Sequence, residues 1–159
     1  MIFVVLGTHE LPFYRLLNEV ERCKKNGTIK DDVIVQHGHT PFKSEVMELR
    51  KFLSYDEMEQ MYDRAHLIIT HGGTGSIVSG LKKRKKVVAA ARLKKYGEHN
   101  DDHQLEIIEQ FVNAHYILSW DEDTALETVI EKAQSFEPRP FVSGKEKIIG
   151  ILRDFISKI

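Results

Sequence analysis

The amino-acid sequence predicts an α/β fold with a mainly parallel, doubly wound sheet. Short apolar runs alternate along the chain with amphipathic segments, as strands alternate with crossover helices in this class. The runs Ile2–Leu6 and Val87–Ala91 are continuously apolar, which is typical of strands covered on both faces. With 159 residues, of which 42% are hydrophobic, the chain has the size of one domain.

The first half of the chain has clear element boundaries. Asn26-Gly27 ends the first helix, and Ser54 with Glu57 forms a capping box that begins the second. The predicted elements are, in order, a strand at Ile2–Leu6, a helix at Leu11–Lys25, strands at Val33–Gln36 and Leu49–Leu53, a helix at Tyr55–Ala65 and a strand at Leu67–Ile69.

The second half continues the alternation after a glycine-rich turn. Its predicted elements are a helix at Ser76–Leu81, a strand at Val87–Ala91, a polar loop at Arg92–Asp102, a helix to about Asn113, a strand at Tyr116–Leu118 and helices at Asp121–Ser135 and Lys145–Ile159. Residues 136–144, which include Pro138 and Pro140, are predicted to link the last two helices within a single domain spanning residues 1–159.

Composition excludes several classes of protein. Lys and Arg number 23 against 24 Asp and Glu, so no overall charge attracts nucleic acid. Cys23 is the single cysteine, which excludes a disulfide framework or a thiolate metal cluster. No apolar run approaches the roughly 20 residues that span a bilayer, so we expect only peripheral membrane contact. The basic run Lys82–Lys86 fits a solvated helix end, or alternatively a contact with anionic lipid or an acidic partner.

The stretch Ile68–Val78 carries the strongest signal for a binding site. A buried strand leads into His71-Gly72-Gly73-Thr74-Gly75-Ser76, and a helix follows. The first N–H groups of a helix lack partners and lie at its positive end, so such a turn can hold a phosphate or diphosphate. Similar turns also occur where nothing binds. A P-loop NTPase is excluded because no Gly-Lys-Ser/Thr follows, and a first strand without G-x-G-x-x-G argues against a nicotinamide dehydrogenase.

Ligands of doubly wound sheets bind beyond the carboxyl ends of the strands, where four polar loops should meet. These loops are Gly7-Thr8-His9, His37-Gly38-His39, His71–Ser76 and Arg92–His103. His9 could be a general base, a ligand contact or a surface histidine, and His71 could orient the turn rather than contact a ligand.

The last of these loops admits three interpretations. His99, Asp101, Asp102 and His103 suit a divalent metal ion, although adjacent residues at a helix start point in different directions. Alternatively, His103 and Gln104 contact a sugar nucleotide, or the segment is simply a well-capped helix start.

Taken together, Thr-His-Gly-Gly-Thr-Gly-Ser at 70–76 and Asp-Asp-His-Gln at 101–104 resemble the C-terminal half of GT-B glycosyltransferases. The nearer resemblance is to the free-standing form, a glycosyltransferase family 28 C-terminal domain. The opening Phe3–Glu10 is similar to members of this family, and Arg92–His99 resembles its PssE-like exopolysaccharide branch. Another branch is the soluble subunit of the eukaryotic split N-acetylglucosaminyltransferase. The resemblance covers residues 1 to about 118.

The resemblance implies a Rossmann-like half that binds a UDP-sugar as substrate, with no cofactor and no metal. Gly72–Ser76 would hold the diphosphate, with His71, Gly73, Thr74 and Gly75 in the same turn, and His103 and Gln104 would approach the donor sugar. Gly7, Thr8 and His9 would face the cleft, with His9 as the candidate catalytic residue. Ser79 occupies the place where MurG-like relatives carry a glutamate for the ribose, so we expect a weak contact there.

The implied reaction is inverting transfer of a hexose, with galactose expected, to a lipid-linked saccharide in exopolysaccharide or capsule synthesis. One such half supplies one wall of a cleft, so we expect a membrane-anchored partner with the N-terminal half, which would hold this cytoplasmic chain at the inner face of the cell membrane. The alternatives are a UDP-N-acetylglucosamine transferase subunit and a non-catalytic nucleotide-binding activator of a partner.

Overall fold

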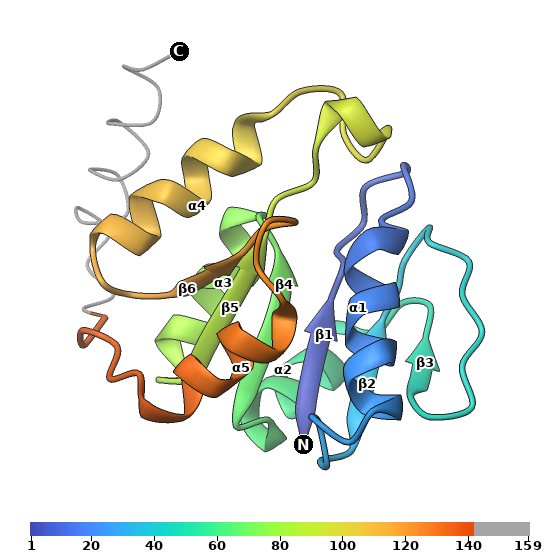
Figure 1. The fold of residues 1–159 in the computed structure, drawn as a ribbon, viewed down its shortest axis with the longest axis horizontal. Coiled ribbons are helices and arrows are strands. Elements are labelled where there is room, and N and C mark those ends of the chain that lie inside the picture. Colours follow the sequence, from blue (N-terminus) through green and yellow to red (C-terminus); the bar gives the residue numbers. More distant parts are fainter. Residues whose placement is uncertain (142–159) are drawn as a thin grey trace.

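Six parallel strands form one sheet at the centre of the computed structural model, which describes residues 1–141 (Figure 1). Their spatial order is β3-β2-β1-β4-β5-β6. The strands are β1 (Ile2–Val5), β2 (Val33–Gln36), β3 (Glu48–Arg50), β4 (Leu67–His71), β5 (Lys86–Ala90) and β6 (Leu118–Trp120). The chain builds outward in one direction from β1 and then in the other from β4, which confirms the predicted doubly wound α/β class and creates a switch point between these two strands.

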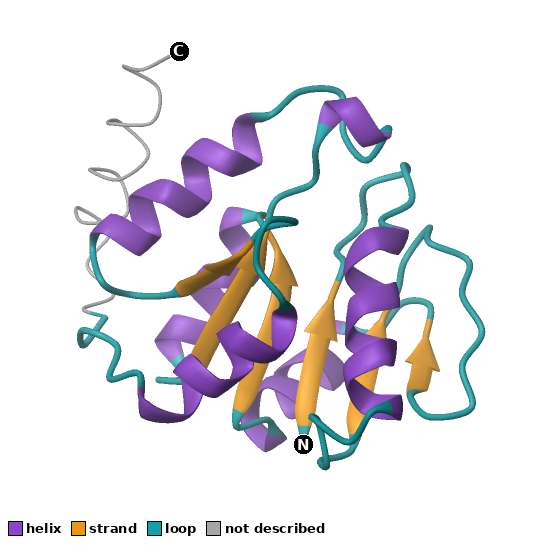
Figure 2. Cartoon of the chain, viewed as in Figure 1, coloured by secondary structure: helices purple, strands orange, loops and turns teal. Residues whose placement is uncertain are grey.

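Helices cover both faces of this sheet (Figure 2). They are α1 (Tyr14–Lys25), α2 (Tyr55–Arg64), α3 (Thr74–Lys82), α4 (His103–Asn113) and α5 (Leu126–Ser135), and a 3₁₀ helix spans Lys94–Tyr96. Alternate residues of β1 face opposite layers: Val4 packs in the core that α1 and α5 close, and Phe3 packs in the core that α2, α3 and α4 close. The continuous apolar run of this strand is therefore buried on both sides, as predicted.

Several predicted boundaries are confirmed by local hydrogen bonds. Ser54 Oγ accepts the N–H of Glu57 at 3.1 Å, and Glu57 Oε1 accepts the N–H of Ser54 at 3.0 Å. This capping box begins α2 at the expected residue. Asn26 caps the C-terminus of α1, and Gly27 follows with a positive φ of 85°.

Other boundaries were predicted wrongly. α1 begins at Tyr14 rather than Leu11, because the N–H of Phe13 donates to Thr40 Oγ1 at 2.8 Å and holds the preceding residues in a loop. β3 ends at Arg50, three residues before the predicted end at Leu53.

The region around β6 differs most from the prediction. β6 lies at Leu118–Trp120 rather than Tyr116–Leu118, since Tyr116 and Ile117 pack in the α4-side core instead of pairing in the sheet. α5 begins at Leu126 rather than Asp121, because residues 121–124 form a turn in which Asp121 Oδ1 accepts the N–H of Asp123 at 2.9 Å.

The charged and C-terminal segments complete the description. Lys83 of the basic run pairs with Glu59 and Asp63 at 2.9 and 2.6 Å, so part of the run is held by the protein itself. No helix among the described residues is long and apolar enough to cross a membrane. The predicted helix Lys145–Ile159 and the end of the predicted linker lie outside the described residues.

Candidate functional site

A cleft of about 730 Å³ opens at the carboxyl ends of β1 and β4, at the switch point of the sheet. Its volume is in the range of small-molecule sites, which are commonly found at this position in doubly wound sheets. Most of the predicted site residues line it: Gly7, Thr8, His9, His71, Gly73, Gly75, Ser76, Ser79 and Gln104. Gly72, Thr74 and His103 do not belong to the lining, and neither does the predicted His37–His39 loop.

The opposite wall of the cleft comes from residues that sequence reasoning missed. Phe52, Leu53 and Tyr55 precede or begin α2, and Met58 and Tyr62 follow on the same helix. Phe52 and Tyr55 are 46% and 79% exposed, so this apolar wall is open to solvent. These residues were predicted as parts of a strand at Leu49–Leu53 and a helix at Tyr55–Ala65, and neither pattern marked them as the wall of a cleft.

The loop after β1 is fixed by a buried side chain of β2. Gly7 has a positive φ of 76°, and its N–H and carbonyl both bond to the Gln36 amide at 2.9 Å. Because this pairing is reciprocal, the backbone of Gly7 is held in one orientation. Gln36 was predicted only as the polar end of a strand.

The His71 imidazole is a buried wedge between the two glycine loops. A Cβ atom at Gly7 would lie 2.5 Å from His71 Nε2, and one at Gly73 would lie 2.4 Å from its Cε1. Burial, with a smaller contribution from the positive charge of Arg92, lowers the pKa of His71 to about 3. The ring is therefore neutral at physiological pH, and it leaves no room for a Cβ atom at either position.

Gln104, on the first turn of α4, connects this wedge to the end of β5. Its Oε1 accepts the N–H groups of Gly72 at 2.9 Å and of Arg92 at 3.0 Å, and its Nε2 lies 3.2 Å from His71 Nδ1. An amide oxygen has two lone pairs, and both are occupied here. The oxygen of Gln104 therefore cannot accept a further hydrogen bond from a donor sugar. The N–H of Gly72 already donates to this oxygen and is not available to a diphosphate.

The first turn of α3 supplies unoccupied hydrogen-bond donors. Gly73 is its N-cap and no side chain caps the helix, so the N–H groups of Thr74, Gly75 and Ser76 have no acceptor among the described residues. A Cβ atom at Gly75 would meet nothing within 4 Å, which shows that space is open beside this turn. Ser79 lies one helical turn after Gly75 and also lines the cleft.

His9 and His99 face this turn as a stacked pair, with ring centroids 4.2 Å apart at 28°. The N–H of Leu11 donates to His9 Nδ1 at 3.1 Å, so neutral His9 carries its proton on Nε2. Burial, followed by the charge of His99, lowers the pKa of His9. With its Nδ1 lone pair occupied, neutral His9 presents Nε2–H as a hydrogen-bond donor, and its role as the candidate catalytic residue stays a prediction.

A buried arginine holds the two loops that carry these histidines. The Arg92 guanidinium donates to the carbonyls of Leu6 at 2.7 Å, Leu11 at 2.6 Å and Glu98 at 3.1 Å. Burial lowers the pKa of Arg92 to about 10, although the carboxylate of Glu98 opposes the shift. Glu98 in turn pairs with Arg15 of α1 at 2.9 Å. A polar loop was predicted at Arg92–Asp102, but these contacts of Arg92 and Glu98 were not.

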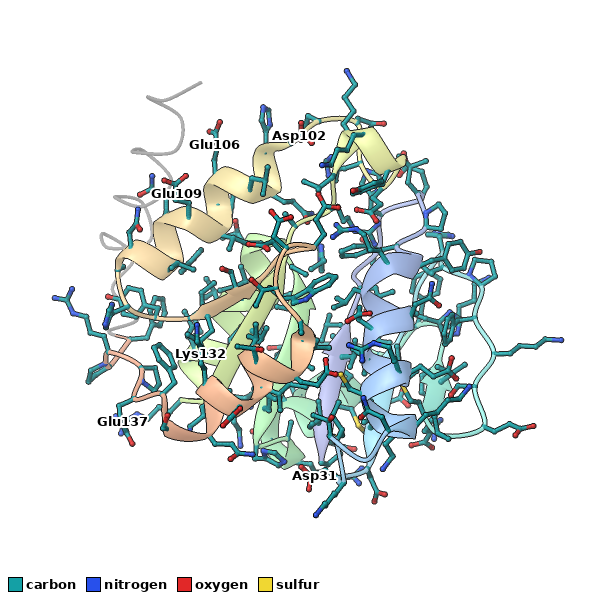
Figure 3. All side chains as sticks on the ribbon, viewed as in Figure 1. Asp31, Asp102, Glu106, Glu109, Lys132 and Glu137 are labelled. Atoms are coloured by element: carbon teal, nitrogen blue, oxygen red, sulfur yellow. The ribbon has the colours of Figure 1, made fainter. Side chains whose placement is uncertain are left out.

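The geometry of the α4 start does not support the metal alternative. Asp101 Oδ1 lies 3.2 Å from His99 Nδ1, whereas Asp102 Oδ1 accepts the N–H of Lys94 instead. Within residues 1–141, no group of three or more His, Cys, Asp or Glu side chains is placed to hold a metal ion. Figure 3 shows Asp102, Glu106 and Glu109 along the outer side of α4.

Comparison with known proteins gives a family and a set of relatives. The family model described as "Glycosyltransferase family 28 C-terminal domain" matches residues 1–159. The UDP-N-acetylglucosamine transferase subunit ALG13 of Yarrowia lipolytica is 36% identical over 83 residues, which are 52% of this chain and 40% of that protein. The subunit of the same name from Candida albicans is 32% identical over 77 residues, 48% of this chain and 25% of that protein. The matches thus span well under half the length of these relatives.

Solved structures share the fold. The NMR solution structure of ALG13 matches with a TM-score of 0.62 at 21% identity, covering 95% of this chain and 94% of that one. The crystal structure of the kitacinnamycin glycosyltransferase matches with a TM-score of 0.57 at 16% identity, covering 98% of this chain and 39% of that one.

Proposed function

We propose a function from one premise: the chain belongs to the glycosyltransferase family 28 C-terminal domain family, whose model matches residues 1–159. In this proposal it is the donor-binding subunit of a two-chain glycosyltransferase that uses a UDP-sugar. The observation that carries the proposal is the cleft at the switch point, into which the uncapped N-terminus of α3 opens.

The diphosphate of the donor is proposed to lie at the first turn of α3. Three backbone N–H groups and the helix dipole provide positive potential there, and the Ser76 hydroxyl adds a further donor. The uracil ring would pack on the apolar wall of Phe52, Leu53 and Met58, and the ribose would pass near Ser79. His9 Nε2–H faces the same space and would donate to the sugar or to a phosphate oxygen.

The relatives favour N-acetylglucosamine over galactose as the transferred sugar. Both curated relatives are named as UDP-N-acetylglucosamine transferase subunits. The expectation of galactose, which rested on Arg92–His99, finds no support among them, and neither does exopolysaccharide or capsule synthesis. We therefore take UDP-N-acetylglucosamine as the donor.

The proposed reaction is an inverting displacement. An acceptor hydroxyl attacks the anomeric carbon, the bond from that carbon to the diphosphate oxygen breaks, and UDP leaves with the electron pair. The negative charge that develops on UDP lies at the N-terminus of α3, where fixed N–H groups stabilise it without reorganisation. The attacking hydroxyl must lose a proton. Because the Nδ1 lone pair of His9 already accepts the N–H of Leu11, we assign the base that takes this proton to the partner's wall of the cleft.

A partner is proposed to form the second wall of the site. Large apolar side chains around the carboxyl ends of the strands are exposed, namely Tyr14, Phe52, Tyr55, Tyr96 and Leu105. Exposed apolar surface beside a binding site commonly marks an interface. The names of both relatives describe subunits, which supports a two-chain enzyme. The partner would carry the membrane anchor and bind a lipid-linked saccharide, and this chain would act at the cytoplasmic face.

Thermal unfolding with a panel of nucleotides tests the donor. UDP and UDP-N-acetylglucosamine should raise the melting temperature, because a ligand at 100 times its Kd stabilises by about 2.7 kcal/mol. ADP and GDP should have little effect. Gly75→Asp should abolish the UDP shift by placing a carboxylate at the diphosphate, whereas Gly75→Asn, of the same size and uncharged, should retain most of it. An equal response to all nucleotides, or none to UDP, would contradict the proposal.

The non-catalytic alternative makes a different prediction. A nucleotide-binding activator would still support sugar transfer by its partner when Gly75 is replaced by Asp. A donor-binding subunit would not, and UDP release by the two-chain complex would stop. The two functions are therefore separated by measuring UDP release with wild-type and Gly75→Asp chains.

A further inference from the structure

A buried chain of hydrogen bonds runs from Gln104 through His71 to Ser76 at the edge of the cleft. We propose that Gln104 and His71 are positioning residues, which turn the hydroxyl proton of Ser76 toward an anionic oxygen of the ligand. This inference rests on the proposed function, because the anionic oxygen would belong to the donor diphosphate.

The orientation of the Gln104 amide is fixed by its backbone partners. The N–H groups of Gly72 and Arg92 converge on one end of the amide at 2.9 and 3.0 Å, and only an oxygen can accept both. The NH₂ group must then face His71 Nδ1 at 3.2 Å. Gln104 is only 6% exposed, so its amide is held mainly by these protein partners.

The tautomer of His71 follows from this orientation. His71 Nδ1 accepts a hydrogen bond from the side-chain NH₂ group of Gln104, so the lone pair of Nδ1 points at that group. The single proton of the neutral ring is therefore on Nε2. Burial of the ring, which lowers the pKa of His71 to about 3, keeps the second proton off. Nε2–H therefore donates to Ser76 Oγ, which lies 3.3 Å away.

This contact decides whether the Ser76 hydroxyl donates or accepts a hydrogen bond on the side of the cleft. Its oxygen accepts from His71, so its own proton is free to point into the cleft that the residue lines. With the opposite tautomer, Ser76 would donate to the ring, and an oxygen lone pair would face the ligand. The backbone of Ser76 is also held, because Tyr62 Oη donates to its carbonyl at 3.0 Å. The relay thus makes the hydroxyl a donor beside the free N–H groups of α3.

The tautomer can be measured directly in the full chain without ligand. Long-range ¹⁵N–¹H NMR spectra distinguish protonated from unprotonated ring nitrogens. Wild-type His71 should show the proton on Nε2 at neutral pH. In Gln104→Glu, the carboxylate can still accept the N–H groups of Gly72 and Arg92 but cannot donate to Nδ1, so Nδ1 should become protonated. Asp102→Asn, a matched change at the start of the same helix, should leave the tautomer of His71 unchanged. A wild-type ring with its proton on Nδ1 would overturn the proposal.

A binding cycle with UDP tests the effect on the ligand. Ser76→Ala should weaken UDP binding about 10-fold or more in the wild-type background, as expected for a lost hydrogen bond to a charged group. In the Gln104→Glu background the same change should alter binding less than about two-fold. Both variants in this second comparison carry the negative charge of the introduced carboxylate, so its effect on UDP affinity cancels. Equal losses in the two backgrounds would show that Gln104 does not orient the hydroxyl.

The two measurements separate this inference from the proposed function. If the wild-type chain binds no UDP, the proposed donor site fails, and with it the ligand that Ser76 is said to face. The NMR experiment still decides whether Gln104 sets the tautomer of His71. If UDP binds and His71 keeps its proton on Nε2 in Gln104→Glu, the donor site stands and the relay is wrong.

Discussion

Alanine at Gly73 is expected to displace the His71 ring and destabilise the fold. The new methyl carbon would lie 2.4 Å from His71 Cε1 and 2.8 Å from Nε2, where carbon atoms in contact normally lie about 3.5 Å or more apart. The ring would have to move by about 1 Å. It cannot do so without breaking its contacts to Gln104 and Ser76, which already measure 3.2 and 3.3 Å.

The cost has two parts. Overpacking of a close-packed site costs about 1–3 kcal/mol, and leaving a buried polar group without its partner costs a further 1–3 kcal/mol, roughly. We therefore expect Gly73→Ala to lower the free energy of unfolding by about 2–6 kcal/mol. For a chain of this length, the melting temperature should fall by about 4–24 °C. Gly7→Ala should cost about 1–2 kcal/mol more, because its φ of 76° is unfavourable for any side chain.

Urea unfolding of single and double variants provides the assay. In a His71→Ala background the obstructing ring is gone, so Gly73→Ala should cost less than about 1 kcal/mol there. Gly7→Ala should keep only its backbone penalty of about 1–2 kcal/mol. Gly75→Ala is the matched control, since a Cβ atom there meets nothing within 4 Å. As a replacement within a helix it should be neutral or stabilise by up to about 1 kcal/mol.

One result would refute this reasoning. If Gly73→Ala is equally costly with and without the imidazole, the ring is not what requires glycine. The backbone of the turn itself would then impose the requirement.

Four further predictions follow from other parts of the fold. Ser54→Ala should cost about 1 kcal/mol in urea unfolding, because it removes the capping box of α2. Glu98→Gln should cost about 3 kcal/mol, since it leaves Arg15 without its buried partner, whereas Glu122→Gln, which breaks an exposed pair, should leave the free energy of unfolding nearly unchanged. Cys23 should react with thiol reagents only on unfolding, because burial raises the pKa of its thiol to about 12. The pKa of His71 is lowered to about 3 only in the folded chain, so as pH falls the unfolded chain takes up a proton on this ring first. The free energy of unfolding should therefore be highest above about pH 6.5 and decrease toward pH 3 by at most about 4–5 kcal/mol. His71→Asn should flatten this part of a stability–pH curve.

Elements whose formation depends on residues close together in the chain could be predicted from the sequence. β1, β4 and β5 are apolar runs buried on both faces, and α2 begins at a capping box. The prediction was wrong where apolar residues are buried without forming a strand. Tyr116 and Ile117 are as apolar as a strand requires, but they lie in the connection that packs under α4. Asp121 was taken as a helix start, yet its carboxylate closes a turn onto Asp123 and α5 begins later.

In the candidate site, too, the features formed by contiguous residues were predicted and those formed by distant residues were not. The turn after β4 was found because strand, glycines and helix are contiguous in the chain. The pairing of Gly7 with Gln36 and of Gly72 with Gln104 joins residues that lie 29 and 32 positions apart, so it depends on the strand order. Arg92 begins a loop that was predicted only as polar, but its backbone partners surround it and leave it 1% exposed.

The polar groups of the cleft also differ in what they can still bind. The amide oxygen of Gln104, the NH₂ group of Gln36 and both ring nitrogens of His71 are occupied within the protein. Their identity matters for the shape of the loops rather than for recognition. What remains for a ligand is mostly backbone: the N–H groups that begin α3.

Such donors fit the diphosphate that every UDP-sugar shares and cannot distinguish one sugar from another. Selection between N-acetylglucosamine and galactose must therefore come from the remaining side chains near the turn, His9 and Thr8, or from the second wall. If exchanging the partner for one from an enzyme with another donor changes the preferred sugar while UDP affinity stays constant, the second wall is the selector. If the preference stays with this chain, Thr8→Ala should relax it, because Thr8 lines the cleft, whereas Ser79→Ala should weaken the binding of every UDP-sugar alike, because Ser79 is proposed to lie near the ribose.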